Sequence, residues 1–198
     1  YTIREYICNF IMSKLETNTI DNISGSSTLT IGDSNTSTIT LKSGATLTNF
    51  PDNTPAFFVH NSSNQTLTDA TTTKVTLDSE DYDTDNAFAS SRFTVPSGEA
   101  GKYLFYTAID CHGGGGSLLD SAYVYIYKNG SSIGELAQDE RNNPARRISV
   151  TATFSLDLAV SDYIEIYANI DRNSGGNGFI VGDSGITTYL GGHKLIGV

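Results

Sequence analysis

Three aspartates that alternate along the chain offer the first candidate chemistry. Asp81, Asp83 and Asp85 are spaced like the start of a calcium-binding loop. The sixth position of such a loop requires glycine but holds Asn86, and the twelfth requires a bidentate glutamate but holds Arg92. We therefore interpret the aspartates as solvated loop carboxylates. We predict no metal and no other cofactor, with a calcium ion as the alternative.

A second candidate is the pair Cys111-His112. Two ligands are too few for a metal site, and no acidic neighbour is spaced as a third. The segment from Thr107 to His112, together with Gly182-Asp183-Ser184-Gly185, is similar to the histidine and serine segments of chymotrypsin-like proteases. However, the histidine and cysteine are in the opposite order and no second glycine follows Gly185. We predict no catalytic residues and a protein that is not an enzyme.

Two loop segments are candidates for ligand binding. The run Gly113-Gly114-Gly115-Gly116 lacks the lysine of a phosphate loop and opens no helix, so it indicates a flexible connection or a loop that adapts to a ligand. Arg141, Arg146 and Arg147 form the only basic cluster of the chain. Guanidinium groups suit carboxylates and sulfates, but such a cluster also occurs as a solvated strand edge.

A third candidate for ligand binding is a predicted strand with two different faces. Tyr123, Tyr125 and Tyr127 alternate with Val124 and Ile126, so the tyrosines share one face and the aliphatic residues the other. The aliphatic face is expected in the core. The tyrosine face is either a subunit contact or a ligand platform. The predicted ligand-binding residues are Gly113, Gly114, Gly115, Gly116, Arg141, Arg146, Arg147 and Tyr125.

Composition limits the partners. The 198 residues carry 22 acidic and 12 basic side chains, a formal net charge of −10. Such a chain is poorly suited to nucleic acid or to an anionic membrane surface, because both require clustered positive charge. No stretch is apolar for long enough to span a bilayer. Cys8 and Cys111 are too few for a disulfide framework and are expected as free thiols.

The first fifty residues differ from the rest. Residues 1–19 are interpreted as a leader, either a short amphipathic helix or sequence upstream of a natural start at Met12. Residues 20–50 contain a repeat, in which Ser27–Asp33 recurs as Ser37–Gly44 with apolar and hydroxyl residues alternating. Strands this short cannot form a core alone. We interpret the segment as a thin β stalk of three chains, with a disordered linker as the alternative.

From residue 55 onward the sequence predicts an all-β domain. Short apolar runs recur without a helical pattern between them, which indicates a β-sandwich of the jelly-roll type. An immunoglobulin-type sandwich is the alternative, although its paired cysteines and core tryptophan are absent. The expected strands lie at 56–59, 74–78, 91–95, 102–109, 122–128, 147–158, 162–170 and 186–196.

Two of these runs carry a recognisable signature. Phe93-Thr94-Val95-Pro96 followed by Gly101-Lys102-Tyr103-Leu104-Phe105 resembles the F-T-x-P … G-x-Y-x-F pattern of the complement C1q and tumour necrosis factor-like domain. Further similar segments extend the resemblance over about residues 55–198, although Ser161 replaces the usual glycine. The resemblance implies a jelly-roll head and a homotrimer. It assigns as core or trimer residues Phe88, Phe93, Gly101, Tyr103, Phe105, Tyr163, Leu190 and Gly192.

The expected function follows from the stalk, the head and the resemblance. Tyr103–Ile109 and Tyr163–Ala168 carry apolar residues on both faces, more than one core needs, so one face is expected on a three-fold axis. We predict a non-enzymatic adhesion or structural protein, the head of a phage or viral fibre, which binds a host-surface glycan or protein at the virion surface. The alternative is a secreted, cell-encoded lectin or cytokine-type protein in the extracellular space.

Overall fold

The computed structural model describes residues 43, 52–183 and 186–196. The chain divides into two units, Tyr1–Thr48 and Asn49–Val198, and every described residue except Ser43 belongs to the second. The expected leader, nearly all of the expected stalk, and Ser184 and Gly185 lie outside the described residues. The predictions made for them stay predictions.

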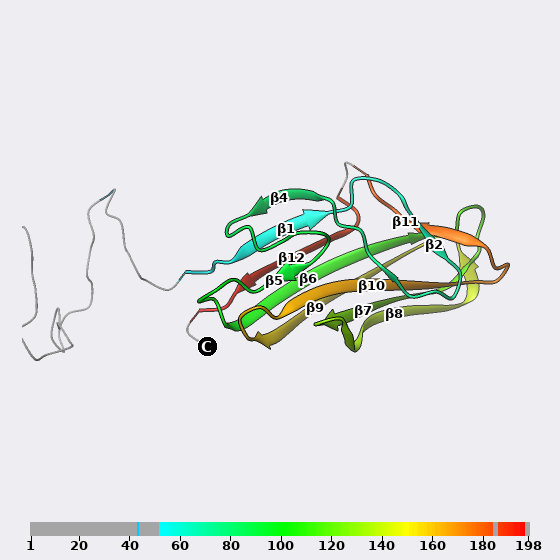
Figure 1. Cartoon of the computed structure of the whole chain (residues 1–198). Helices are drawn as coiled ribbons and strands as arrows, with labels where there is room; N and C mark the ends of the chain where they lie inside the picture. The colour runs from blue at the N-terminus through cyan, green and yellow to red at the C-terminus, as the bar shows by residue number, and fades with distance from the viewer. Residues whose placement is uncertain (1–42, 44–51, 184–185, 197–198) are drawn as a thin grey trace, which may run out of the picture. The chain divides into compact units, whose positions relative to one another are not determined.

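The second unit consists of twelve strands in two antiparallel sheets (Figure 1). Neither a helix nor an apolar segment fit to cross a membrane as a helix occurs in the part of the chain that the structure describes. The strands are β1 (Ala56–His60), β2 (Gln65–Thr68), β3 (Thr73–Lys74), β4 (Ser79–Asp83), β5 (Phe93–Thr94), β6 (Gly101–His112), β7 (Leu119–Lys128), β8 (Ser131–Ala145), β9 (Arg147–Leu158), β10 (Tyr163–Arg172), β11 (Asn177–Ile180) and β12 (Tyr189–Lys194).

The order of the strands is that of a jelly roll. One sheet contains β1, β12, β6 and β9 as successive neighbours, with β4 beyond β1 and the pair β11 and β2 beside the end of β6. The other contains β5, β10, β7 and β8 as successive neighbours, with β3 also pairing β10. The first strand, β1, and the last strand, β12, are thus adjacent, and the chain crosses repeatedly between the two sheets. The predicted all-β jelly-roll sandwich is confirmed.

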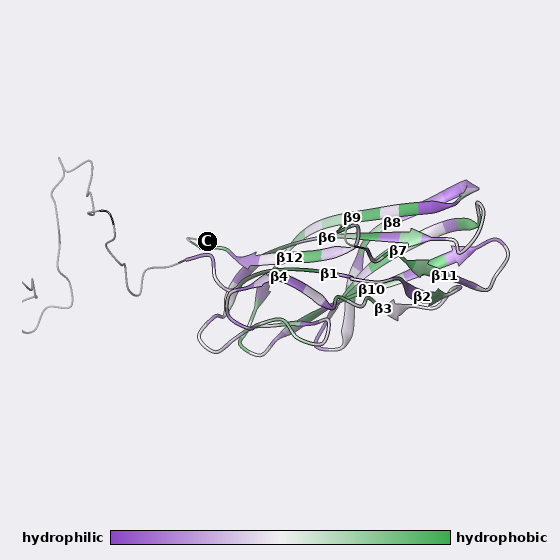
Figure 2. Ribbon diagram, turned by 90° about the horizontal axis from the view of Figure 1, so that it is seen from above, coloured by the Kyte–Doolittle hydropathy of each residue, from purple (hydrophilic) through white to green (hydrophobic). Residues whose placement is uncertain are grey.

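Aromatic rings fill the space between the sheets. Phe93 lies at their centre, with ring centroids 4.9 Å from Phe57, 5.3 Å from Tyr103 and 5.7 Å from Phe105. The Tyr103 hydroxyl donates a hydrogen bond of 2.5 Å to the carbonyl of Glu99, so this ring buries its apolar body without losing its polar partner. Figure 2 shows hydrophobic and hydrophilic residues alternating along the strands, as a core between two sheets requires.

The residues that the family resemblance singled out lie mainly in this core. Phe88, Phe93, Tyr103, Phe105 and Leu190 are all buried. Gly101 begins β6, and Gly192 lies against the Phe105 ring, where an added Cβ would come within 2.7 Å of a ring carbon. Tyr163 instead lies on the outer face of the second sheet, under the Arg92 guanidinium at 4.5 Å.

The aspartates expected in a loop lie elsewhere. Asp81 and Asp83 belong to β4, which the sequence did not predict, and only Asp85 follows the strand. Asp83 accepts hydrogen bonds from the backbone N–H groups of Ala87 at 3.0 Å and Phe88 at 2.8 Å. The loop interpretation was therefore wrong for two of the three aspartates. The Asp83 carboxylate holds the turn that places Phe88 in the core.

Strand β8 is the largest element that sequence reasoning missed. Its fifteen residues are mostly polar and include Gly134 and Pro144, which both disfavour strands. The strand lies at the edge of its sheet and pairs only with β7. Its other side has no neighbouring strand, so the missing N–H of proline is tolerated there. The expected strands at 74–78 and 91–95 are shortened to β3 and β5.

The turn between β9 and β10 depends on one ionised carboxylate. Asp162 accepts hydrogen bonds from the Asn129 side chain at 2.7 Å and the Ala159 N–H at 2.9 Å, and its carboxylate pairs with Lys128 at 2.7 Å. These donors, with the Asn129 bond first, lower the pKa of Asp162 to about 2. Ser161 beside it has a φ of +69°, the left-handed conformation that favours the glycine it replaces.

We expect this carboxylate to contribute to acid stability. A group whose pKa is lower in the folded state stabilises the protein above its unfolded pKa, about 3.9, and loses that contribution as pH falls towards 2. Asp162→Asn should therefore lower stability at pH 6 and flatten its decline between about pH 4 and 2. Urea unfolding over this range measures both effects. Asp157→Asn, at an exposed position of β9, is the control that should leave the profile unchanged.

Candidate functional site

Three segments meet at one end of the sandwich, which we call the loop end and define as residues 113–118, 141–146 (the end of β8 and the residue after it) and 173–176. The Gly113 N–H donates to the Arg146 carbonyl at 3.0 Å, and the Asn173 N–H donates to the Leu118 carbonyl at 3.1 Å. The chain enters at the opposite end, where the Lys194 N–H donates to the Pro55 carbonyl at 3.1 Å and the Leu195 N–H donates to the Lys102 carbonyl at 2.8 Å. Strand β6 runs from one end to the other (Figure 1).

The glycine run is fixed at its start and open at its tip. Arg172 Nε donates to the Gly113 carbonyl at 3.1 Å. Gly114 has a φ of +76°, and a Cβ there would lie 2.6 Å from the Asn177 carbonyl oxygen, so only glycine fits this position. Gly115 and Gly116 are exposed, and nothing lies within 4 Å of a Cβ added at Gly116. Close contacts thus restrict Gly113 and Gly114, and for the tip the expected flexible connection stays a prediction.

Each predicted arginine has a partner. Arg147 forms two bonds of 2.6 Å to the buried carboxylate of Asp110, from Nε and from a terminal nitrogen. Arg141 pairs with Asp139 at 2.5 Å, and Arg146 Nε lies 3.1 Å from His112 Nε2. Carboxylates thus neutralise two of the three arginines. The concentrated positive charge that made this cluster attractive for an acidic glycan is largely compensated inside the protein.

Cys111 and His112 cannot act as a pair, because adjacent strand residues point to opposite faces. Cys111 is buried in the core, and burial raises the pKa of its thiol to about 12, so it stays protonated at neutral pH. His112 stacks on Phe179 with ring centroids 4.6 Å apart, and burial, with Arg146 second, lowers its pKa. Nowhere in the described ranges do three or more histidine, cysteine or acidic side chains cluster as metal ligands. The absence of a metal, with calcium at the three aspartates as the alternative, stays a prediction.

The two faces of β7 are as predicted. Val124 and Ile126 are buried in the core, which confirms the aliphatic face. The outer side carries the tyrosine face, which we define as Tyr123, Tyr125, Tyr127 and Tyr167. Tyr123 and Tyr125 stack at 6.3 Å, and Tyr127 and Tyr167 at 3.9 Å. Burial, with the Glu135 carboxylate second, raises the pKa of Tyr125, so its hydroxyl stays protonated at neutral pH.

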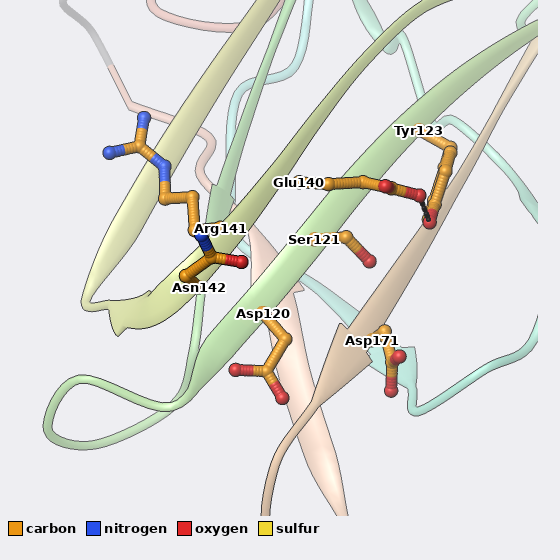
Figure 3. A pocket seen from close by; sticks show the side chains of 7 residues that line it. All are labelled: Asp120, Ser121, Tyr123, Glu140, Arg141, Asn142 and Asp171. Atoms are coloured by element: carbon orange, nitrogen blue, oxygen red, sulfur yellow. Dashed lines mark hydrogen bonds between the residues drawn. The ribbon is translucent and has the colours of Figure 1, made fainter.

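A polar hollow of about 310 Å³ lies where the tyrosine face reaches the loop end (Figure 3). Its floor is Ser121 on β7, which lies between Asp171 on β10 and Glu140 on β8. Its remaining lining comes from Asp120, Tyr123, Arg141 and Asn142.

A bulge in β8 creates the hollow. Leu119 pairs with Ala145 and Ser121 pairs with Glu140, so two steps along β7 face five along β8. Residues 141–144 thus face Asp120 alone, three residues more than a regular ladder holds, and Pro144 among them has no N–H to donate to a ladder. Sequence reasoning had selected Arg141 and Tyr125 nearby but none of the carboxylates, because their proximity depends on the register of three strands.

A second surface lies on the other sheet. Phe58 lies among Tyr82, Tyr106 and Tyr189, with ring centroids 6.4, 6.2 and 5.2 Å away, and we call these four residues the aromatic patch. The Tyr106 ring covers Gly191, where an added Cβ would lie 2.3 Å from it. Burial, with a hydrogen bond to Tyr82 second, raises the pKa of Tyr106 to about 12. The patch lies on the outer face of β4, β1, β12 and β6.

Comparison with known proteins finds similarity in fold only. No family model and no curated protein matches the sequence. Similar solved structures include the globular domain of zebrafish complement 1qA, with 17% identity, a TM-score of 0.48, and 71% of this chain and 97% of that chain covered. Murine APRIL at pH 8.0 shows 15% identity, a TM-score of 0.49 and coverage of 71% and 98%. Eiger TNF from S. frugiperda shows 14% identity, a TM-score of 0.48 and coverage of 72% and 93%.

We expect the arginines to differ in their effect on stability. Arg147→Ser leaves the buried Asp110 carboxylate without its partner and should cost about 1–3 kcal/mol of unfolding free energy. Arg141→Ser breaks a surface pair and should cost less than about 1 kcal/mol. Urea unfolding of both variants measures the difference. Equal losses would contradict the structural role given to Arg147.

Proposed function

We propose that the chain is a non-enzymatic binding protein that assembles as a homotrimer through the aromatic patch and presents its loop ends to a surface glycan or protein. The aromatic patch is the observation that carries this proposal. The sandwich already has a complete core on the inner side of the same sheet, where Phe57, Phe105 and Leu190 are buried. The core of one copy is therefore complete without the four rings of the patch.

The exposure of the patch favours burial against protein. Tyr82 is 48% exposed, and Phe58, Tyr106 and Tyr189 are partly exposed. An aromatic side chain can bury about 150–250 Å² of surface, and such residues dominate the energetics of interfaces. A contiguous apolar patch on an outer sheet face is typical of an interaction site. The same patch on identical copies can meet itself around a closed symmetry axis.

The number of copies is taken from the sequence resemblance, which implies three. The expectation that one face of Tyr103–Ile109 lies on the axis then places Leu104 and Tyr106 there, since these partly exposed side chains alternate with buried ones. Ala108 shares this face but is already buried within one copy. For Tyr163–Ala168 the outer face belongs to the second sheet and carries Glu165. We therefore propose only the first face as the interface.

The arrangement of the two ends supports a role at the tip of a fibre. The repetitive segment precedes the sandwich in the sequence, and the chain enters at the end opposite the loop end. Three loop ends on one trimer would bind a repetitive surface with an avidity of about 10²–10⁴ times the single-site affinity. A phage or viral fibre head has this layout. A secreted lectin would use the same surfaces and differs in origin rather than in chemistry.

We expect Tyr106→Arg to abolish assembly. Three copies of a guanidinium close to one axis repel each other, and the ring that covers Gly191 is lost. Light scattering at micromolar concentration should give about three times the chain mass for the native protein and one chain mass for the variant. The control is Tyr125→Arg, the same change on the outer face of the other sheet, which should stay trimeric.

The binding role is measured on the same proteins. Labelled native trimer should bind host cells or a glycan array, and the monomeric Tyr106→Arg variant should bind at least about 100-fold more weakly because avidity is lost. A native protein that is monomeric in light scattering, or a Tyr106→Arg variant that remains trimeric, would contradict the proposed interface.

A further inference from the structure

We propose that the hollow at the loop end binds a sugar unit that carries a protonated amine. This inference deepens the proposed binding function and rests on it, since it names the chemical group that each loop end would recognise. The hollow combines three acidic side chains, a buried hydroxyl without a partner, an amide and a tyrosine. Each of these features restricts the ligand in a different way.

The first restriction is charge. Asp120, Glu140 and Asp171 line the hollow, and within the described residues the side chains of Asp120 and Asp171 form no hydrogen bond or ion pair. The only cation of the lining, Arg141, is paired with Asp139, and Figure 3 shows its guanidinium pointing away from the three carboxylates. Three like charges at one site repel each other and repel anionic sugars. A cationic group would relieve this repulsion.

The second restriction comes from the floor. Ser121 is only 3% exposed, and its Oγ forms no hydrogen bond of normal geometry in the structure. A buried hydroxyl without a partner destabilises the fold, so such groups in native proteins call for an explanation. Ser121 lies between Asp171 and Glu140 on the neighbouring strands and lines the hollow. A ligand that reaches the floor would supply the missing hydrogen bond.

Tyr123 fixes one carboxylate in place. Its hydroxyl donates a hydrogen bond of 2.5 Å to Glu140, drawn as the dashed line in Figure 3. This bond raises the pKa of Tyr123. The tyrosine stays a proton donor at neutral pH. One Glu140 oxygen is thereby engaged, and the other is available to a ligand.

Size and spacing favour a sugar ring over a bare ion. The acidic side chains are not grouped closely enough to hold a metal ion, as no such group occurs in the described ranges. The hollow of about 310 Å³ is far larger than an ammonium group, which occupies about the 30 Å³ of a water molecule. Ser121 and the Asn142 amide offer neutral hydrogen bonds that an amine alone does not need. Ring hydroxyls would use them.

The test compares small ligands on the full-length native protein. D-glucosamine, D-glucose and Nα-acetyl-lysine amide differ in whether they carry the amine, the ring hydroxyls or both. Calorimetric titration should give an affinity for glucosamine at least about tenfold above that for the other two, because one hydrogen bond to a charged group is worth about a factor of ten or more in affinity. In heteronuclear spectra the shifted signals should include those of Ser121 and Tyr123.

Single substitutions assign the binding to the hollow. Asp171→Asn keeps the shape of an exposed side chain that has no partner, and Ser121→Ala removes only the floor hydroxyl. Each should weaken glucosamine binding by about tenfold or more. Asp157→Asn on β9 is the matched control, the same change at an exposed position of the other sheet, and should not alter affinity. Light scattering confirms that every variant keeps the native mass.

The possible outcomes separate this inference from the proposed function. Equal affinity for glucose would overturn the role of the amine, and equal affinity for the lysine derivative would indicate a protein ligand instead. Absence of glucosamine binding, or binding that survives both Asp171→Asn and Ser121→Ala, would overturn the site while a cell-binding trimer remained valid. A monomer that nevertheless binds glucosamine through Asp171 would overturn the assembly and leave the site standing.

Discussion

The packing of Phe93 against Phe57 and Phe105 between the two sheets determines what the outer surfaces carry. Side chains alternate across a strand, so a residue placed in the core fixes its neighbour on the outside. With Phe57 and Phe105 inside, Phe58 and Tyr106 must lie outside. A slip of one residue in either strand would exchange the core with the aromatic patch. The patch is thus as firmly specified as the core.

The same constraint on β7 produces the hollow. Ala122 and Val124 are buried, so Ser121 and Tyr123 face outward between the side chains of β8 and β10. The surplus residues of β8 then bulge from the ladder and form one side of the hollow. Core packing therefore positions the floor, whereas an irregular edge strand shapes the wall. Edge strands tolerate such irregularity because only one side is paired.

The fold could be predicted from sequence because the pattern that identifies each main strand lies within that strand. Alternating apolar residues identify β6, β7, β9 and β10 without knowledge of their partners. The edge strand β8 could not be identified, since its polar residues and Pro144 argue against a strand and only the pairing with β7 outweighs them. The arginines were recognisable as a cluster. Their neutralisation was not, because Asp110 lies 37 residues from Arg147 and becomes its neighbour only through the pairing of β6 with β9.

The candidate site was harder to predict for the same reason. Ser121, Glu140 and Asp171 come from three strands, and nothing in their local sequence distinguishes them from other polar residues of an acidic chain.

The position of the hollow also bears on assembly. The aromatic patch covers the outer face of one sheet, whereas the hollow opens on the outer face of the other. An interface through the patch would therefore bury the apolar face and leave the acidic face free in every copy. The proposed interface and the proposed binding site would then be open to separate alteration, because they lie on opposite sheets of the sandwich.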